Sequence, residues 1–289
     1  MVSNDINSLI SLLDDPDSEI YKAVSEKIIT QGITIVPQLE KAWEISENEF
    51  VQNRLENLIQ TIQFKSTEDA LALWINSGTQ DLLEGTHLIA RFQYPELTFS
   101  SIEKEIEKYR RDAWLEMNDN LTALEKVKII NHILFDIHNF GPNVTHFFSP
   151  NNQYINLLFE TKKGGPILLS IFYATIAQRL GLPIHCVNLP KNFVLAYKDR
   201  FYPITESSDE RDSILFYINP FNRGSVFGRK EIDVFLQQQK IDPKPEYYLP
   251  CSNRTAIAQL MFNLVFAYEK QSNFKKAEDI KKLLKIVEG

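Results

Sequence analysis

Cysteine is scarce in this chain, with only Cys186 and Cys251 among 289 residues. Two cysteines that are 65 positions apart form neither a disulfide framework nor a CxxC pair. This usage excludes a small disulfide-stapled fold and fits a reducing cytoplasm.

Long hydrophobic runs are also missing. The longest nearly apolar stretch, residues 166–177, is shorter than the roughly 20 residues that span a bilayer. The first residues, MVSNDINSLISLLDD, have no basic group ahead of their apolar ones, so no signal peptide is expected. With 44% hydrophobic and 24% charged residues, the composition is that of a globular protein with a sizeable core and no membrane partner.

Motifs for nucleotides and metals are absent as well. The sequence contains no GxxxxGK[ST], no GxGxxG and no HExxH. Gly164-Gly165 alone is weak evidence for a phosphate site. His132 and Asp136, four residues apart on one expected helix, could share a metal, but metal-binding helices usually bring a third ligand. We therefore expect no cofactor and no metal.

Positive charge is in short supply in the first part of the chain. The net charge is −7, and residues 1–120 hold 22 acidic and only 10 basic residues. Residues 121–289 hold 16 acidic and 21 basic residues, whose mild excess fits a solvated helix face. The acidic half argues against nucleic acid as a partner.

Helical patterns dominate both ends of the chain. Residues 1–64 read as short paired helices with an Asp-Pro turn, which resemble HEAT-type repeats. A capping-box pattern at Ser66 predicts the start of a new helix there, and Thr122 with Glu125 predicts another start. Residues 251–289 read as a single helical hairpin of tetratricopeptide size.

The centre of the chain predicts one buried helix. Pro166 begins an apolar run that Gly181 and Pro183 end, and a helix that is apolar all round is a buried one. Gly164 and Gly165 precede it, so its first N–H groups suit an anion or a thiolate. Short runs at 184–187, 193–197, 201–204 and 214–218 follow, and they predict a small antiparallel sheet packed on this helix.

Several segments resemble the SirB-type transglutaminase-like family, within the superfamily that also contains papain-type cysteine peptidases. They are IINHILFDIHNFGPN (129–143), KKGGPILLSIFYATIAQRLGLPIHCVNLP (162–190), NFVL (192–195) and INPFNRG (218–224). DLLEGTHLIARFQYPEL (81–97) and the terminal hairpin fit the same family, so the resemblance covers about residues 80–289.

The resemblance implies where a catalytic triad would stand. The superfamily places a Cys at the start of the central helix, a His on the next strand and an Asp on the strand after. Here those positions are Pro166, Asn192 and Asn219. An asparagine amide does not exchange a proton near pH 7, and proline carries no nucleophile. The cysteine-type mechanism is therefore not expected, and the catalytic positions are interpreted as vestigial.

Three other residues compete for a chemical role. Ser170, one turn inside the central helix, would need an adjacent base such as His185, but it is more simply a helix residue bonded to the carbonyl one turn back. Cys186 lies in a strand pattern typical of a buried thiol. Gly164, Gly165 and Ser170 are the candidate cleft residues.

The sequence thus predicts an α+β, mostly helical fold whose transglutaminase-like core is flanked by helical hairpins. The expected parts are HEAT-like helices (1–64), the core with its preceding helices (65–250) and the tail hairpin (251–289). The leading hypothesis is a non-catalytic protein-interaction or regulatory module, a monomer or weak homodimer with an unidentified protein partner. A hydrolase or amide transferase using Ser170, Cys186 or a histidine, and a binder of a small anionic ligand at the helix N-terminus, remain alternatives.

Overall fold

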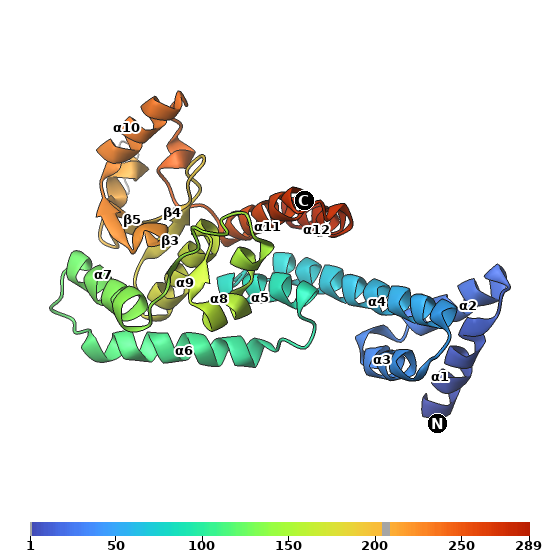
Figure 1. The fold of residues 1–289 in the computed structure, drawn as a ribbon. Coiled ribbons are helices and arrows are strands. Elements are labelled where there is room, and N and C mark those ends of the chain that lie inside the picture. The colour runs from blue at the N-terminus through green and yellow to red at the C-terminus, as the bar shows by residue number, and fades with distance from the viewer. Residues whose placement is uncertain (1, 204–208) are drawn as a thin grey trace. The chain divides into compact units, whose positions relative to one another are not determined.

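The computed structural model describes residues 2–203 and 209–289, which fall into two compact units, residues 1–70 and 71–289. Figure 1 shows the elements of both units. Within the described residues, every helix is too short or too polar to cross a membrane.

The first unit consists of short helices: α1 (Val2–Ser11), α2 (Ser18–Ile29), α3 (Val36–Ile45) and the first part of α4 (Glu49–Asn76). Asp17 caps α2 by accepting a hydrogen bond from the Glu19 N–H at 2.8 Å. The Arg54 guanidinium lies 4.0 Å from the ring centroids of both Tyr21 and Phe50. These contacts hold the helices around a core of fully buried aliphatic side chains: Leu13, Ile28, Leu39 and Leu55.

The helix start predicted at Ser66 is wrong. Ser66 lies in the interior of α4, which runs unbroken from Glu49 to Asn76. The next residue, Thr67, donates its hydroxyl to the Gln63 carbonyl at 2.9 Å, one turn back in the same helix. A Ser-Thr pair can bond inside a helix in this way as well as cap one, so the local pattern did not decide between the two structures. By contrast, the capping box of Thr122 and Glu125 is formed as predicted.

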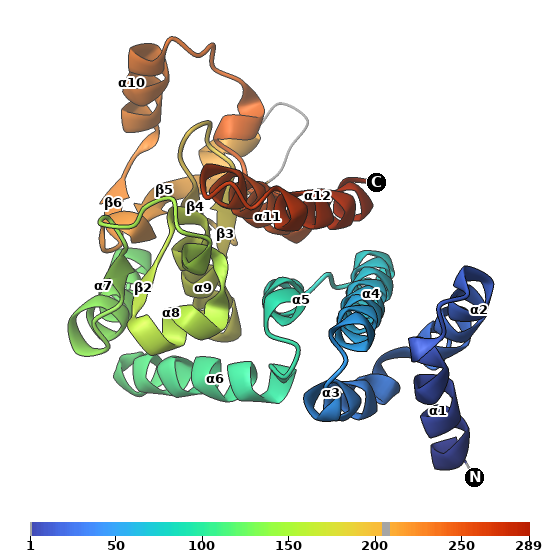
Figure 2. The same cartoon turned by 45° about the vertical axis from the view of Figure 1, so that its right-hand side comes forward.

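The second unit is built around one buried helix, α9 (Pro166–Arg179). Each residue from Ile167 to Ala177 is buried, which confirms the prediction from the apolar run. The helix ends as predicted at Gly181, whose φ of +74° few other residues adopt. Around α9 lie α5 (Leu82–Gln93), α6 (Phe99–Glu116), α7 (Ala123–Asn131) and α8 (Ile155–Thr161), as Figure 2 shows. The helix α10 (Arg229–Gln239) lies away from α9 and packs through Ile232 and Leu236 against residues of the sheet.

A four-stranded antiparallel sheet covers one side of α9. Its order is β3 (Ile184–Val187), β4 (Val194–Lys198), β5 (Ile214–Asn219) and β6 (Ser225–Phe227). Cys186 pairs with Leu195, and Ile218 pairs with both Leu195 and Val226. The predicted antiparallel sheet, and with it the mostly helical α+β class, is confirmed. The strand predicted at 201–204 is wrong over residues 201–203, which form a turn and irregular backbone, and residue 204 lies outside the described residues. The sequence patterns did not reveal β6 or the short parallel pair of β1 (Gly141–Pro142) with β2 (Lys163–Gly164).

Three of the family-like segments meet at Asn131. Its side-chain amide donates to the Gly224 carbonyl at 2.8 Å, and its oxygen accepts the Tyr173 hydroxyl at 3.0 Å. Gly224 has φ +72°, and a Cβ built there would lie 1.9 Å from Asn131 Oδ1. Only glycine fits this approach, so Asn131, Tyr173 and Gly224 together fix α7, α9 and the turn after β5.

The tail is a helical hairpin of α11 (Asn253–Lys270) and α12 (Phe274–Glu288), which contacts α5 and α9. A buried network of side-chain hydrogen bonds anchors this hairpin. The Tyr154 and Tyr268 hydroxyls lie 2.7 Å apart, and Tyr268 also donates to Gln93 Oε1 at 3.2 Å. Lys276 Nζ reaches the same oxygen at 2.6 Å. Its burial lowers the pKa of the Lys276 ammonium.

Candidate functional site: a cleft at the start of the central helix

The floor of the cleft is the start of α9. Gly165 is the N-cap residue and offers no side chain to cap the helix, and Pro166 occupies the first helical position. The Gly165 N–H donates to the Asn152 carbonyl at 3.0 Å. A Cβ on Gly165 would meet Gln153 Nε2 at 3.2 Å and the Asn152 carbonyl at 3.3 Å. The glycine is therefore explained by the close approach of the turn at residues 150–153.

Lys162 anchors the segment that leads into the glycines. Its backbone has φ +59°, and its Nζ donates to the Tyr109 hydroxyl at 2.9 Å. The same ammonium lies 4.7 Å from the centroid of the Phe140 ring. Burial lowers the pKa of the Lys162 ammonium. This lysine therefore holds the start of α9 against α6 and does not line the cleft.

One wall of the cleft is the loop that carries Phe147 and Phe148. Asn152, which is buried, donates its side-chain amide to the carbonyls of His146 at 2.7 Å and Phe147 at 2.9 Å. Its oxygen accepts the Asn143 amide at 2.8 Å. Asn152 thus uses its carboxamide to shape the loop and leaves both phenylalanine rings about half exposed, at 43% and 54%.

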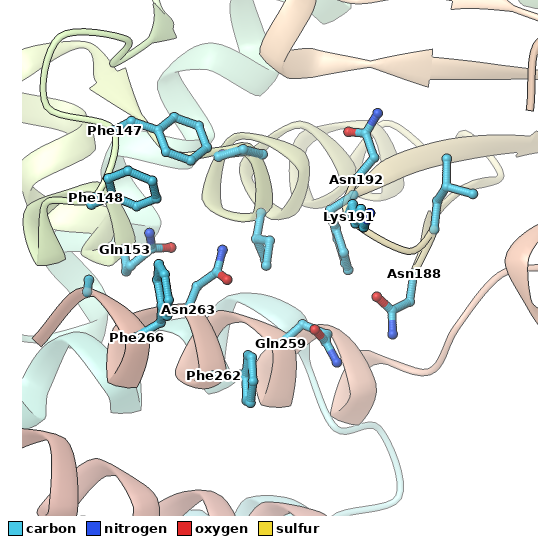
Figure 3. Close-up of a pocket in the computed structure, with 15 residues that line it drawn as sticks. Phe147, Phe148, Gln153, Asn188, Lys191, Asn192, Gln259, Phe262, Asn263 and Phe266 are labelled. Carbon is cyan, nitrogen blue, oxygen red and sulfur yellow. The ribbon is translucent and has the colours of Figure 1, made fainter. Parts of the chain in front are cut away.

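The second wall is one face of α11. Gln259, Phe262, Asn263 and Phe266 follow one another at helical spacing and all line the cleft. Phe262 is 59% exposed and Phe266 is 41% exposed. Figure 3 shows these four side chains along α11, facing Phe147, Phe148 and Gln153 on the left and the β3–β4 turn on the right.

The third wall is the turn between β3 and β4, with Asn188, Leu189, Lys191 and Asn192. Lys191 has φ +61°, and its Nζ donates to Gln239 Oε1 at 3.1 Å. The three walls enclose about 330 Å³. Lys191 is the one ionisable side chain among the described residues that line this volume.

Carboxamides provide most of the polar character of the cleft. They belong to Gln153, Asn188, Asn192, Gln259 and Asn263. Gln153 is only 4% exposed, yet its Oε1 has no hydrogen-bond partner in the described part of the protein. A buried carboxamide oxygen without a donor is unusual in a folded protein, because most such atoms are paired.

Two of the three predicted triad positions line the cleft together. Pro166 opens α9, and Asn192 lies two residues before β4. Asn219 ends β5 but does not line the cleft. Its Oδ1 accepts the Asn222 N–H at 3.2 Å and so caps the short helix at Pro220–Asn222.

Within the described residues, no hydrogen bond joins the side chains of Asn192 and Asn219. The reason is local: an asparagine at a strand end that precedes a turn bonds to the backbone of that turn.

The alternative nucleophiles are buried away from this surface. Ser170 is fully buried and donates to the Phe193 carbonyl at 3.3 Å, so the expected bond to the carbonyl one turn back is wrong. Cys186 is also buried, and burial raises the pKa of its thiol. Burial lowers the pKa of the His185 imidazole. The pKa shifts of the thiol and the imidazole both favour the neutral forms.

His132 and Asp136 do form a pair, with His132 Nδ1 3.2 Å from Asp136 Oδ2. The other carboxylate oxygen accepts Arg223 at 2.6 Å. A cation of the protein thus occupies the place of a third ligand. Within the described ranges, residues 2–203 and 209–289, no group of three or more His, Cys, Asp or Glu side chains is placed to hold a metal.

Sequence reasoning missed the aromatic walls and Gln153. A signal was present on α11. Its buried stripe of Ile257, Leu260, Met261 and Leu264 already accounts for the core, yet Phe262 and Phe266 lie outside that stripe. Two phenylalanines four residues apart on the solvent side of an amphipathic helix indicate a binding face.

Comparison with known proteins identifies the core. A family model described as transglutaminase-like superfamily matches residues 100–262. A UPF0162 protein of Xylella fastidiosa (strain Temecula1) is 25% identical over 218 residues, which cover 72% of this chain and 73% of the relative. A UPF0162 protein of Vibrio cholerae is 20% identical over 200 residues, or 68% of this chain and 70% of the relative.

A partial relative extends the likeness. The F-box only protein 21 of Mus musculus is 29% identical over 109 residues, which are 38% of this chain and 17% of that protein. No solved structure matches the chain. The family model covers more than half of the 289 residues and contains Pro166, Asn192 and Asn219. The chain belongs to the transglutaminase-like superfamily.

Proposed function

We propose that this chain is a non-catalytic transglutaminase-like protein that acts as a protein-interaction or regulatory module through the cleft at the start of α9. The observation that carries the proposal is the chemistry of the cleft. Pro166 and Asn192 stand where a thiol and an imidazole would be needed, and the surrounding polar groups are carboxamides together with Lys191. Such a surface can bind through hydrogen bonds and apolar contact, but it provides no nucleophile and no general base.

Exposed aromatic rings support binding to a protein. Phe148 and Phe262 are each more than half exposed on either side of the cleft. Aromatic side chains supply much of the binding energy at protein interfaces, whereas most of them are buried in a protein that binds nothing. Cys186 and Cys251 are free thiols, so the proposal includes a reducing compartment such as the cytoplasm.

The rival enzyme hypothesis needs a nucleophile that reaches solvent. Ser170 and Cys186 are buried, and the Ser170 hydroxyl is already bonded to a main-chain carbonyl. The anion hypothesis is supported by the uncapped start of α9 and by Lys191. It does not explain the buried Gln153 Oε1, which needs a donor and would repel an anion.

Photocrosslinking in the native cell tests the proposal. We expect a benzoylphenylalanine at position 262 to capture a protein partner. The same group at position 274 is the control, because Phe274 is 64% exposed on α12 and does not line the cleft. Equal capture at both positions, or no capture at 262, would contradict the interaction module.

Activity assays test the second half of the proposal. Purified protein is expected to incorporate no amine into a glutamine-containing protein and to cleave no peptide library. Turnover that iodoacetamide abolishes, or that is lost in Ser170→Ala, would show that the chain is an enzyme.

A further inference from the structure

We propose that the cleft binds an extended, non-basic segment of a partner protein, with an apolar side chain of that segment seated against α11. This inference rests on the proposed function and names the chemistry of the partner. The site is composite. Pro166 and Asn192 come from the transglutaminase-like core, whereas Phe262, Asn263 and Phe266 come from the tail hairpin at and beyond the end of the family match.

The first indication is the unpartnered carboxamide of Gln153. The side chain is 96% buried and lines the cleft, and its Oε1 accepts no hydrogen bond from the described protein. Figure 3 shows Gln153 at one end of the cleft, between Phe148 and Asn263. A bound group with an N–H would supply the missing donor.

The second indication is the start of α9. No side chain caps this 14-residue helix. Pro166 has no N–H and the Gly165 N–H donates to Asn152, so the N–H groups of Ile167 and Leu168 are those without an acceptor within the helix. Ile167, in that first turn, lines the cleft. A ligand there must offer an acceptor to the helix and a donor to Gln153. A peptide group offers both, whereas a phosphate or a carboxylate offers acceptors only.

The third indication is the arrangement of the other carboxamides. Asn188 and Asn192 lie on one side of the cleft and Gln259 and Asn263 on another, as Figure 3 shows. A helical ligand could not pair its main chain with these carboxamides, because its N–H and C=O groups are already hydrogen-bonded to each other. An extended segment leaves its N–H and C=O groups free to pair with side-chain amides. The occupant is therefore extended.

The fourth indication is the aromatic surface between the two walls. The rings of Phe148 and Phe266 meet edge to face with centroids 5.7 Å apart, and Phe147 meets Phe148 at 5.1 Å. Phe262 lies one turn before Phe266 on the same helix face. Rings from two separate segments thus form one exposed apolar surface that matches an aliphatic or aromatic side chain.

Charge selects among such segments. Lys191 lines the cleft, and Lys270 Nζ lies over the ring of the cleft residue Phe266, 5.2 Å from its centroid. No carboxylate lines the described part of the cleft. A cleft lined by a lysine and by no carboxylate, with a second lysine over one of its rings, disfavours lysine and arginine in the partner and favours neutral or acidic residues.

Selection of displayed random nonapeptides that bind the immobilised full-length chain tests this inference. We expect selected peptides to contain an aliphatic or aromatic residue and to be depleted of lysine and arginine. The best peptide is then synthesised in two forms, one unmodified and one with main-chain N-methylation at the two positions flanking the apolar residue. Fluorescence anisotropy is expected to show at least tenfold weaker binding of the methylated form, because it keeps the side chains but loses main-chain donors.

Matched variants locate the site. Phe262→Ser and Gln153→Met are expected to weaken peptide binding at least tenfold, and Phe274→Ser is expected to leave it within twofold. Circular dichroism confirms folding of each variant, and if Gln153→Met does not fold, Phe262→Ser with its control decides alone. Equal loss in Phe262→Ser and Phe274→Ser would overturn the inference.

Other outcomes are equally decisive. Enrichment of basic peptides, unchanged binding after N-methylation, selection of helical peptides or no selection at all would each refute an extended non-basic occupant. Crosslinking of a partner at position 262 with any of these results would leave the interaction module standing and remove only this inference. Amide turnover would remove the proposed function itself.

Discussion

Substituting Gly224 by alanine tests the junction where three family-like segments meet. The residue has φ +72°, a region in which a Cβ costs about 1–2 kcal/mol. The new Cβ would also lie 1.9 Å from Asn131 Oδ1, so Asn131 must move. Movement breaks its bonds to Gly224 and Tyr173, each of which contributes about 0.5–1.5 kcal/mol. We expect Gly224→Ala to lower the free energy of unfolding by about 2–5 kcal/mol.

Three other glycines of the same unit separate the two causes. Gly78→Ala meets no atom within 4 Å and has no left-handed backbone, so its effect is expected within about 0.5 kcal/mol. Gly181→Ala combines φ +74° with a Cβ that would meet only Arg200 Nη2, at an ordinary contact distance of 4.0 Å, and isolates the backbone cost of about 1–2 kcal/mol. Gly85→Ala places a Cβ 2.7 Å from the Trp74 ring and isolates overpacking, at about 1–3 kcal/mol.

Urea unfolding followed by tryptophan fluorescence is the assay. The chain has three tryptophans, and a Trp43→Phe background leaves only Trp74 and Trp114, both within residues 71–289. The signal then reports the second unit alone, which a probe of the whole chain would not do. If Gly224→Ala unfolds within about 0.5 kcal/mol of Gly181→Ala, the Asn131 junction contributes nothing and the reasoning is wrong.

Three further predictions concern buried polar groups. Tyr268→Phe should lower the free energy of unfolding by about 1–3 kcal/mol, because it leaves the buried Tyr154 hydroxyl without its partner. Tyr154→Phe should lower it less, because Tyr268 still donates to Gln93, and equal losses in urea unfolding would contradict these hydrogen bonds. Iodoacetamide at pH 8 should label neither cysteine in the native protein and both in guanidinium, because burial raises the pKa of the Cys251 thiol to about 11 and also raises the pKa of the Cys186 thiol. Fast labelling of either cysteine in the native protein, detected by mass spectrometry, would contradict this. Burial lowers the pKa of His87 below 6.5, so the unfolded chain binds its proton more readily and stability is lost as pH falls below 6.5. His87→Gln should reduce the difference in unfolding free energy between pH 7 and pH 5, and an unchanged difference would exclude His87 as a source.

The fold was largely readable from the sequence because its signals are local. Pro166 and Gly181 mark both ends of α9, and each acts through its own backbone conformation. The strands before Asn219 were likewise found from short β-forming runs. The unbroken course of α4 was not found, because Ser66 and Thr67 suit a helix start and a helix interior almost equally well.

The candidate site was only partly readable because it is assembled from distant segments. Pro166 and Asn192 were identified from the family-like motifs and do share a cleft. Gln153 and Phe266 are 113 positions apart in the sequence, and nothing local indicates that they face the same space. Asn219 illustrates the converse error. A motif predicted its position on the strand, but the bond of its side chain to Asn222 depends on the turn that follows.

The resemblance motifs and the cleft therefore report different properties of the protein. Asn131, Tyr173 and Gly224 come from three of the motifs, and their contacts stabilise the core without touching the cleft. The aromatic face of α11 comes from the tail hairpin and makes no contribution to that junction. A relative that keeps the junction but changes Phe262 and Phe266 would keep the fold and change its ligand. Membership of the superfamily thus constrains the scaffold, whereas in our proposal the choice of partner depends on the loop of Phe147 and Phe148 and on the exposed side of α11.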